Sequence, residues 1–97
     1  MTQETMAIKP EFLAKIKSGE KKIEFRSWLS DARRFSLVNE KTGKIEAIID
    51  VAEVIDTKDF PEEDLEEMYD AQGISEEFRE EYDCRYAYLI QEVHSVH

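Results

Sequence analysis

The sequence predicts an α+β fold, most simply a small curled sheet or barrel of about five strands with helices packed against its open side. Two observations lead to this prediction. Apolar residues alternate with polar ones in some segments, at the period of a strand, and recur at helical spacing in others. The three glycines, Gly19, Gly43 and Gly73, each fall at the end of such a segment, where turns are expected.

The predicted elements follow the order β-α-β-β-β-α-α-β. They are strands over residues 5–8, 21–26, 34–39, 44–55 and 85–93, and helices over residues 10–18, 59–72 and from Ser75 onward. In the first helix, Pro10 suits the first position because its missing N–H is not needed there, and Gly19 suits a left-handed end. Two lysines of the last turn, Lys15 and Lys17, complement the helix dipole.

After the first helix the apolar period changes to two. In the strand over residues 21–26, Ile23 and Phe25 point to one side, and the charged residues point to the other, namely Lys22, Glu24 and Arg26. Farther along, Gly43 suits the position of a hairpin connection that needs positive φ. Ser75 is a good N-cap for the last helix.

Charge is distributed unevenly along a chain whose net charge is −10. Residues 9–34 carry eight Lys or Arg against four acids, whereas residues 59–83 carry twelve acids against Arg79 alone. The negative net charge repels the phosphates of nucleic acids and so opposes non-specific binding to them, and we expect no binding to duplex DNA. The basic segment can still accept a short anionic or polar ligand. The acidic segment, Asp59–Asp83, is either a solvated helix face or a surface for a basic protein partner.

Length and composition indicate one domain over residues 1–97, located in the cytoplasm and not in a membrane. A chain of 97 residues has the size of a single domain. Its one cysteine, Cys84, cannot form an internal disulfide, so nothing requires an oxidising compartment. No apolar run approaches the roughly 20 residues that span a bilayer, and Met1–Pro10 lacks the apolar core of a signal peptide.

The cation-rich stretch Ile8–Trp28 carries the candidate site residues. Lys21, Glu24 and Arg26 can bind a polar planar ligand or transfer a proton in a sheltered cleft, but alternating charges on a strand also form surface ladders. Trp28 follows directly, either as a stacking platform for a base or as an anchor of its loop on the core. Spacing alone leaves both alternatives open.

Neither a metal nor a cofactor is expected. His94 and His97 have a spacing found in metal sites, but a site needs further ligands on a fixed frame. Cys84 follows Asp83 in acidic surroundings that raise a thiol pKa, so it is a poor nucleophile. The sequence contains neither a glycine-rich phosphate loop nor a Ser-His-Asp arrangement.

The stretch resembles the ASCH domains, a branch of the PUA-like superfamily. The family pattern Gly-x-Lys-x-x-Glu-x-Arg stands complete here as Gly19, Lys21, Glu24 and Arg26, after a Lys9-Pro10-Glu11 helix start typical of the group. The resemblance extends over most of the chain, in the order of the predicted elements. It implies a PUA-like β-barrel with a cleft beside the motif.

The resemblance also implies a function. Members of the family are proposed to bind RNA or nucleotide-like ligands, so the expected partner is a short single-stranded RNA or a nucleotide-like small molecule. The ligand-binding residues implied for this chain are Lys9, Gly19, Lys21, Glu24, Arg26 and Trp28.

Two alternative functions remain open. One group of ASCH proteins hydrolyses acetylated cytidine with a lysine, a threonine and a distal glutamate. Here Lys21 falls at the lysine position and Glu24 at the threonine position, and the distal acid would be one of those in Glu62–Glu81. An amidohydrolase of an acylated nucleoside would use Lys21 and Glu24 as catalytic residues. The other alternative is an adaptor whose acidic segment, Asp59–Asp83, binds a basic protein.

Overall fold

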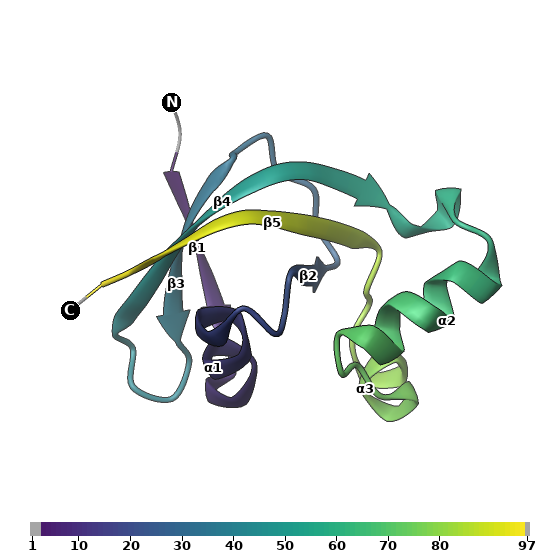
Figure 1. Cartoon of the computed structure of the whole chain (residues 1–97), viewed down its shortest axis with the longest axis horizontal. Coiled ribbons are helices and arrows are strands. Elements are labelled where there is room, and N and C mark those ends of the chain that lie inside the picture. Colours follow the sequence, from purple (N-terminus) through teal and green to yellow (C-terminus); the bar gives the residue numbers. More distant parts are fainter. Residues whose placement is uncertain (1–2, 97) are drawn as a thin grey trace.

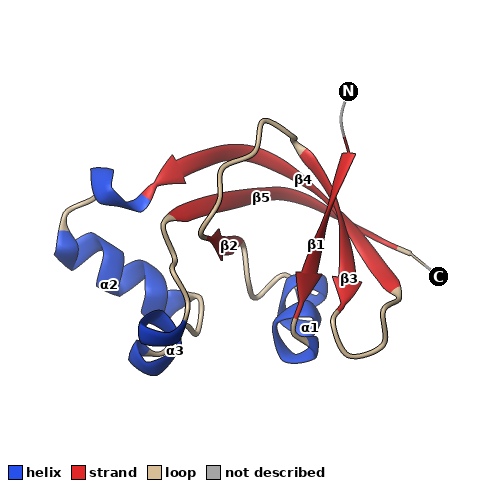
Figure 2. Ribbon diagram, turned by 180° about the vertical axis from the view of Figure 1, so that it is seen from behind, coloured by secondary structure: helices blue, strands red, loops and turns tan. Residues whose placement is uncertain are grey.

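A computed structural model describes residues 3–96 as a five-stranded sheet that curls into a half-barrel, with three α-helices packed against it (Figures 1 and 2). The strands are β1 (Gln3–Ile8), β2 (Ile23–Arg26), β3 (Arg34–Asn39), β4 (Ile45–Asp56) and β5 (Tyr86–Ser95). The helices are α1 (Pro10–Ser18), α2 (Glu62–Ala71) and α3 (Glu76–Glu81), and a short 3-10 turn, η1 (Thr57–Asp59), precedes α2. The predicted α+β class and element order are confirmed.

The strand order in the sheet is β1-β3-β4-β5-β2, so β1 and β2 form its edges. β1 runs parallel to β3, and the other neighbours are antiparallel. The long strand β4 shifts its register with β5 at Asp50/Val51 and at Val51/Glu53. Such bulges bend a strand and increase its twist, which curls the sheet. Figure 1 shows β4 and β5 arching over β2 and α1.

Two apolar clusters hold the fold together. The larger cluster receives Leu13 and Ile16 from α1, because these residues lie on one helix face. The smaller cluster packs Phe25 of β2 against Tyr69 of α2. Successive residues of β5 belong to different clusters, Ala87 to the smaller and Tyr88 to the larger, so the clusters lie on opposite faces of this end of the sheet.

The predicted turns have the expected backbone. Gly19 ends α1 with φ of 86°, and its N–H donates to the carbonyl of Ile16. Gly43 has φ of 76° in the connection between β3 and β4. Both positions need the left-handed conformation that glycine adopts without strain. Within residues 3–96, every helix is too short or too polar to cross a bilayer.

The structure differs from the sequence prediction at β2, which begins at Ile23 and not at Lys21. The reason is that the N–H of Lys21 donates to the carbonyl of Lys15, and that of Lys22 donates to Gln72 Oε1. The interpretation of the charged side chains as a surface ladder is wrong. Glu24 is only 7 % exposed, and the residue opposite it on β5 is Tyr88.

Candidate functional site

A cleft of about 180 Å³ opens where the β1–α1 junction, β2 and the end of α3 meet. It combines charged and aromatic side chains from segments far apart in the sequence. The lining residues are Ala7, Ile8, Lys9, Phe12, Glu24, Phe25, Arg26, Ser27, Trp28, Glu40, Phe78, Tyr82 and Asp83. Of the six ligand-binding residues implied by the family resemblance, Lys9, Glu24, Arg26 and Trp28 line this cleft.

Glu24 places a buried carboxylate in the cleft wall. Its strand neighbour Phe25 packs into the smaller apolar cluster on the other face, so the alternation of β2 turns Glu24 toward the inner face. Glu24 Oε1 accepts a hydrogen bond from the N–H of Phe25 at 3.2 Å. The second oxygen, Oε2, is buried and accepts no hydrogen bond from the described residues. A buried acceptor of this kind is rare in native proteins and calls for a partner, which a water or a ligand can supply.

Lys21 lies behind Glu24 and does not belong to the lining of the cleft formed by residues 3–96. It is 1 % exposed, and its Nζ donates to the carbonyl of Ile23 and lies 3.9 Å from Glu24 Oε1. The ammonium also sits over the rings of Phe12 and Phe25, at 5.6 and 5.5 Å from their centroids. Burial lowers the pKa of Lys21 below its usual range, and Glu24 opposes that shift.

Arg26 connects the motif to the opposite edge of the sheet. Its NH2 group donates to the carbonyl of Ala7 on β1 at 2.7 Å and lies 3.9 Å from Glu24 Oε2. Its Nε is buried and has no hydrogen-bond partner among residues 3–96. The motif therefore sets a carboxylate between two cations, Lys21 and Arg26.

Trp28 anchors its loop on the core and also lines the cleft. Its ring packs against Tyr88 and Phe35, with centroids 5.4 and 6.1 Å away, and the Tyr88 hydroxyl donates to the Trp28 carbonyl at 2.6 Å. Trp28 is nevertheless 36 % exposed and lines the cleft. It is thus an anchored ring that still offers surface to a ligand.

Lys9 lines the cleft, together with Phe78 and Tyr82. Gly19 does not line the cleft formed by the described residues. Lys9 Nζ stands 5.0 Å from the ring centroid of Tyr82 and 5.8 Å from that of Phe78. A hydrogen bond with the Tyr82 side chain raises the pKa of Lys9. Gly19 serves the fold by ending α1, as described above.

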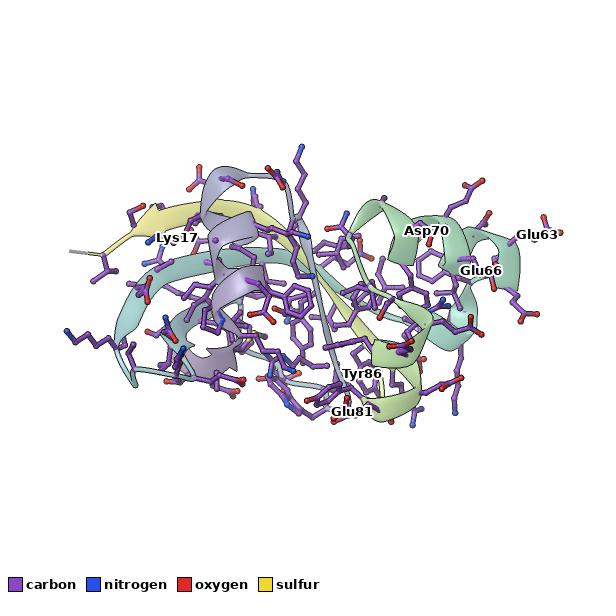
Figure 3. All side chains as sticks on the ribbon, turned by 90° about the horizontal axis from the view of Figure 1, so that it is seen from below. Lys17, Glu63, Glu66, Asp70, Glu81 and Tyr86 are labelled. Carbon is purple, nitrogen blue, oxygen red and sulfur yellow. The ribbon has the colours of Figure 1, made fainter. Side chains whose placement is uncertain are left out.

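Sequence reasoning missed several lining residues. Glu40 comes from the turn after β3 and Asp83 from the segment after α3, and only the tertiary fold brings them to Glu24. No acid of Glu62–Glu81 lines the cleft in the part of the chain that the structure describes. Figure 3 shows Glu63, Glu66 and Asp70 projecting outward from α2, where all three are exposed. Phe78 and Tyr82 both line the cleft. Their spacing of one helical turn was the feature of the sequence that could have predicted that they lie side by side.

Other candidate groups lie outside the cleft. Asp50, Glu92 and His94 bring their oxygen and nitrogen atoms within 4.8 Å of one another, but Arg34 already holds both oxygens of Asp50, at 2.7 and 3.2 Å. The positive charge of Arg34 beside Asp50 disfavours the binding of a metal cation by these three residues. His97 lies outside the described residues. Burial and then Asp83 raise the pKa of the Cys84 thiol, which confirms the expected direction.

Comparisons with known proteins agree with this architecture. Residues 6–97 match the ASCH domain family. Among solved structures, the chain resembles ASCH from Zymomonas mobilis with a TM-score of 0.68 and 22 % identity, over 92 % of this chain and 67 % of that chain. A tyrosine-to-phenylalanine variant of the same protein gives a TM-score of 0.70 and 18 % identity, over 99 % and 74 % of the two chains.

At these identities the structural likeness concerns the fold alone. A search of the curated proteins finds no match. The family match, in contrast, covers nearly the whole chain and includes the complete motif from Gly19 to Arg26. The protein therefore belongs to the ASCH domain family.

Proposed function

We propose that this ASCH domain binds one base of a short single-stranded RNA or of a nucleotide-like molecule in the cleft beside Glu24. The observation that carries the proposal is the buried Glu24 Oε2, which has no hydrogen-bond donor among residues 3–96 and belongs to a residue that lines the cleft together with the partly exposed Trp28. A base can supply both a hydrogen-bond donor for Glu24 Oε2 and a ring that stacks on Trp28. Its exocyclic amine can donate to the carboxylate, and its ring can stack on the indole.

The charged motif has a separate task for each residue. Arg26 holds the edge strands together beside the base. The position of Lys21 behind Glu24 favours a supporting role, in which the ammonium holds the carboxylate in place. Stacking on one aromatic ring is worth about 1–3 kcal/mol per base, which is enough for weak and selective binding when the carboxylate is already in place.

An NMR titration of the labelled domain tests this proposal, with cytidine, acetylated cytidine and a short single-stranded RNA as probes. We expect chemical-shift changes clustered on Glu24–Trp28 and on the cleft residues Tyr82 and Asp83. Trp28→Ala is expected to weaken binding about tenfold, the loss of one stacked base. Leu29→Ala is the matched control, because Leu29 is the next residue, is 61 % exposed and does not line the cleft formed by the described residues.

Two outcomes would contradict the proposal. No shift with any of the three probes would show that the cleft does not take a base. Equal losses in the Trp28 and Leu29 variants would place the binding surface elsewhere.

A second candidate function, amidohydrolysis of an acylated nucleoside, is favoured by one observation. Burial lowers the pKa of Lys21 and so increases the share of the neutral, nucleophilic amine. Against it, Glu24 stands at the position of the family's threonine, and Lys21 does not reach the cleft surface. Acetate release from acetylated cytidine that disappears in Lys21→Ala would establish this activity. Its absence across a panel of acylated nucleosides would exclude it.

A further inference from the structure

Carboxylates outnumber cations in the lining of the cleft. Three carboxylates, Glu24, Glu40 and Asp83, line it with two cations, Lys9 and Arg26, and the buried ammonium of Lys21 lies behind Glu24. The cleft belongs to a chain with a net charge of −10, so the long-range field is negative. An anion that approaches the cleft is repelled at long range, and a cation is attracted.

Both cations of the lining are already engaged within the protein. Lys9 Nζ rests over the rings of Tyr82 and Phe78 at 5.0 and 5.8 Å. Arg26 donates to the Ala7 carbonyl and faces Glu24. A phosphate at the cleft would have to compete for these groups, because phosphate binding normally relies on cations with free donors.

The aromatic side chains have the opposite preference. Ring faces attract cations, and Lys9 shows this for the rings of Phe78 and Tyr82. Trp28, the best type of aromatic residue for such contacts, is 36 % exposed, and no cation of residues 3–96 lies over its ring. Glu24, in the same lining, has a buried Oε2 without a donor among residues 3–96, so the cleft combines an aromatic surface with a buried carboxylate.

The size of the cleft limits the ligand to a single heterocycle. A volume of about 180 Å³ lies below the roughly 300–1,000 Å³ of sites that enclose a drug-sized molecule. A base fits such a space, whereas its sugar and any phosphate would remain at the acidic mouth, beside Asp83 and Glu40.

We propose that the cleft selects a positively charged planar heterocycle, such as a nucleobase methylated on a ring nitrogen, over its neutral isomer, and that it discriminates against a phosphate at its mouth. This inference rests on the proposed function, because it names the class of base that the same cleft takes. The positive ring lies between the Trp28 face and the Glu24 carboxylate, and its exocyclic amine donates to Oε2.

Pairs of isomers test this selection, because they differ in charge and not in size. The adenine series compares 1-methyladenosine, which is cationic at neutral pH, with neutral N6-methyladenosine and with adenosine monophosphate. The cytosine series compares 3-methylcytidine with 5-methylcytidine and cytidine monophosphate. Calorimetry measures each affinity. We expect the cationic isomer to bind about tenfold more tightly than the neutral one, with the monophosphate weakest, and the preference to shrink as salt rises.

Asp83→Asn removes one negative charge from the exposed rim of the cleft, and Asp70→Asn removes the same charge from the exposed face of α2, outside the lining. We expect the first variant to reduce the preference for the cation about threefold and the second to leave it unchanged. Equal effects of the two substitutions would assign the preference to net charge and overturn the local role of the cleft.

The remaining outcomes separate this inference from the function on which it rests. In a series whose members bind, equal affinity for the two isomers would overturn the selection and leave base binding intact. Tighter binding of the monophosphate than of the cationic isomer would do the same. If no nucleoside, nucleotide or RNA probe binds, base binding itself is overturned, and the selection with it.

Discussion

The guanidinium of Arg26 donates a hydrogen bond to the carbonyl oxygen of Ala7 at 2.7 Å, and this bond joins the two edge strands of the curled sheet. β2 and β1 have no backbone pairing with each other in the described residues. The arginine of the family motif therefore closes the open side of the half-barrel at the place where the cleft forms. Its first task is to hold Glu24 and Ala7 at a fixed separation.

Replacing Arg26 by alanine is expected to lower the free energy of unfolding by about 1–3 kcal/mol, because the Ala7 carbonyl loses its charged donor and Glu24 loses a neighbouring cation. Arg33→Ala is the control, since among residues 3–96 that exposed guanidinium bonds only to carbonyls of its own loop, and its loss is expected to stay within about 0.5 kcal/mol. Denaturant unfolding measures both. Similar losses of unfolding free energy in the two variants would mean that the hydrogen bond between Arg26 and Ala7 does not stabilise the fold more than an exposed loop contact does.

The pair Lys21 and Glu24 is expected to be strongly coupled, because both side chains are buried: removal of Glu24 leaves the Lys21 charge uncompensated, and removal of Lys21 leaves Glu24 with Arg26 alone. Lys21→Met and Glu24→Gln should each destabilise by about 3 kcal/mol, and the double variant should lose clearly less than the sum. The exposed pair Lys17 and Glu46 is the control, with an expected coupling below about 1 kcal/mol. Additive losses at Lys21 and Glu24 would contradict the coupling.

Local patterns predicted most of the fold, because each element carries its own signals. The helix from Pro10 to Ser18 and its end at Gly19 follow from residues next to one another in the chain, and the structure reproduces them. The long strand before Asp56 and the order of the elements follow in the same way. Such signals act over a few residues and need no knowledge of the tertiary fold.

The burial of Glu24 could not be predicted in this way. Strand alternation assigns Glu24 to the charged side of β2, but only the curl of the sheet turns that side inward. The same holds for Glu40 and Asp83, which enter the cleft from distant turns. The stretch that carries the family motif lines the cleft from Glu24 to Trp28, whereas the division between these residues and the buried Lys21 depends on the three-dimensional structure.

Asp50 gives a pH dependence with a defined sign. Its hydrogen bonds with Arg34 and His94 lower the carboxyl pKa from 3.8 to about 2. A depressed pKa stabilises the folded state above pH 3.8, and this contribution disappears as the pH falls through about 2. Wild type should therefore be more stable than Arg34→Gln at pH 5, and the difference should shrink as the pH falls toward 2. Because the pair lies near the surface, the effect is modest and screened by salt. A difference that is constant over this range would contradict the assignment.

The Tyr88 hydroxyl positions Trp28 without entering the cleft lining of residues 3–96, since it donates to the Trp28 carbonyl at 2.6 Å. Tyr88→Phe keeps the ring that supports the indole and removes only this bond. We expect a loss of about 1 kcal/mol in stability, a mobile indole, and weaker binding of the base. Trp28 is the one tryptophan of the chain, so its fluorescence anisotropy reports the motion directly. Tyr86→Phe, the same change two positions earlier on β5, should leave the anisotropy and the affinity unchanged. If Tyr88→Phe also leaves both unchanged, the packing against Tyr88 and Phe35 alone fixes Trp28, and the hydroxyl has no part in presenting it to a ligand.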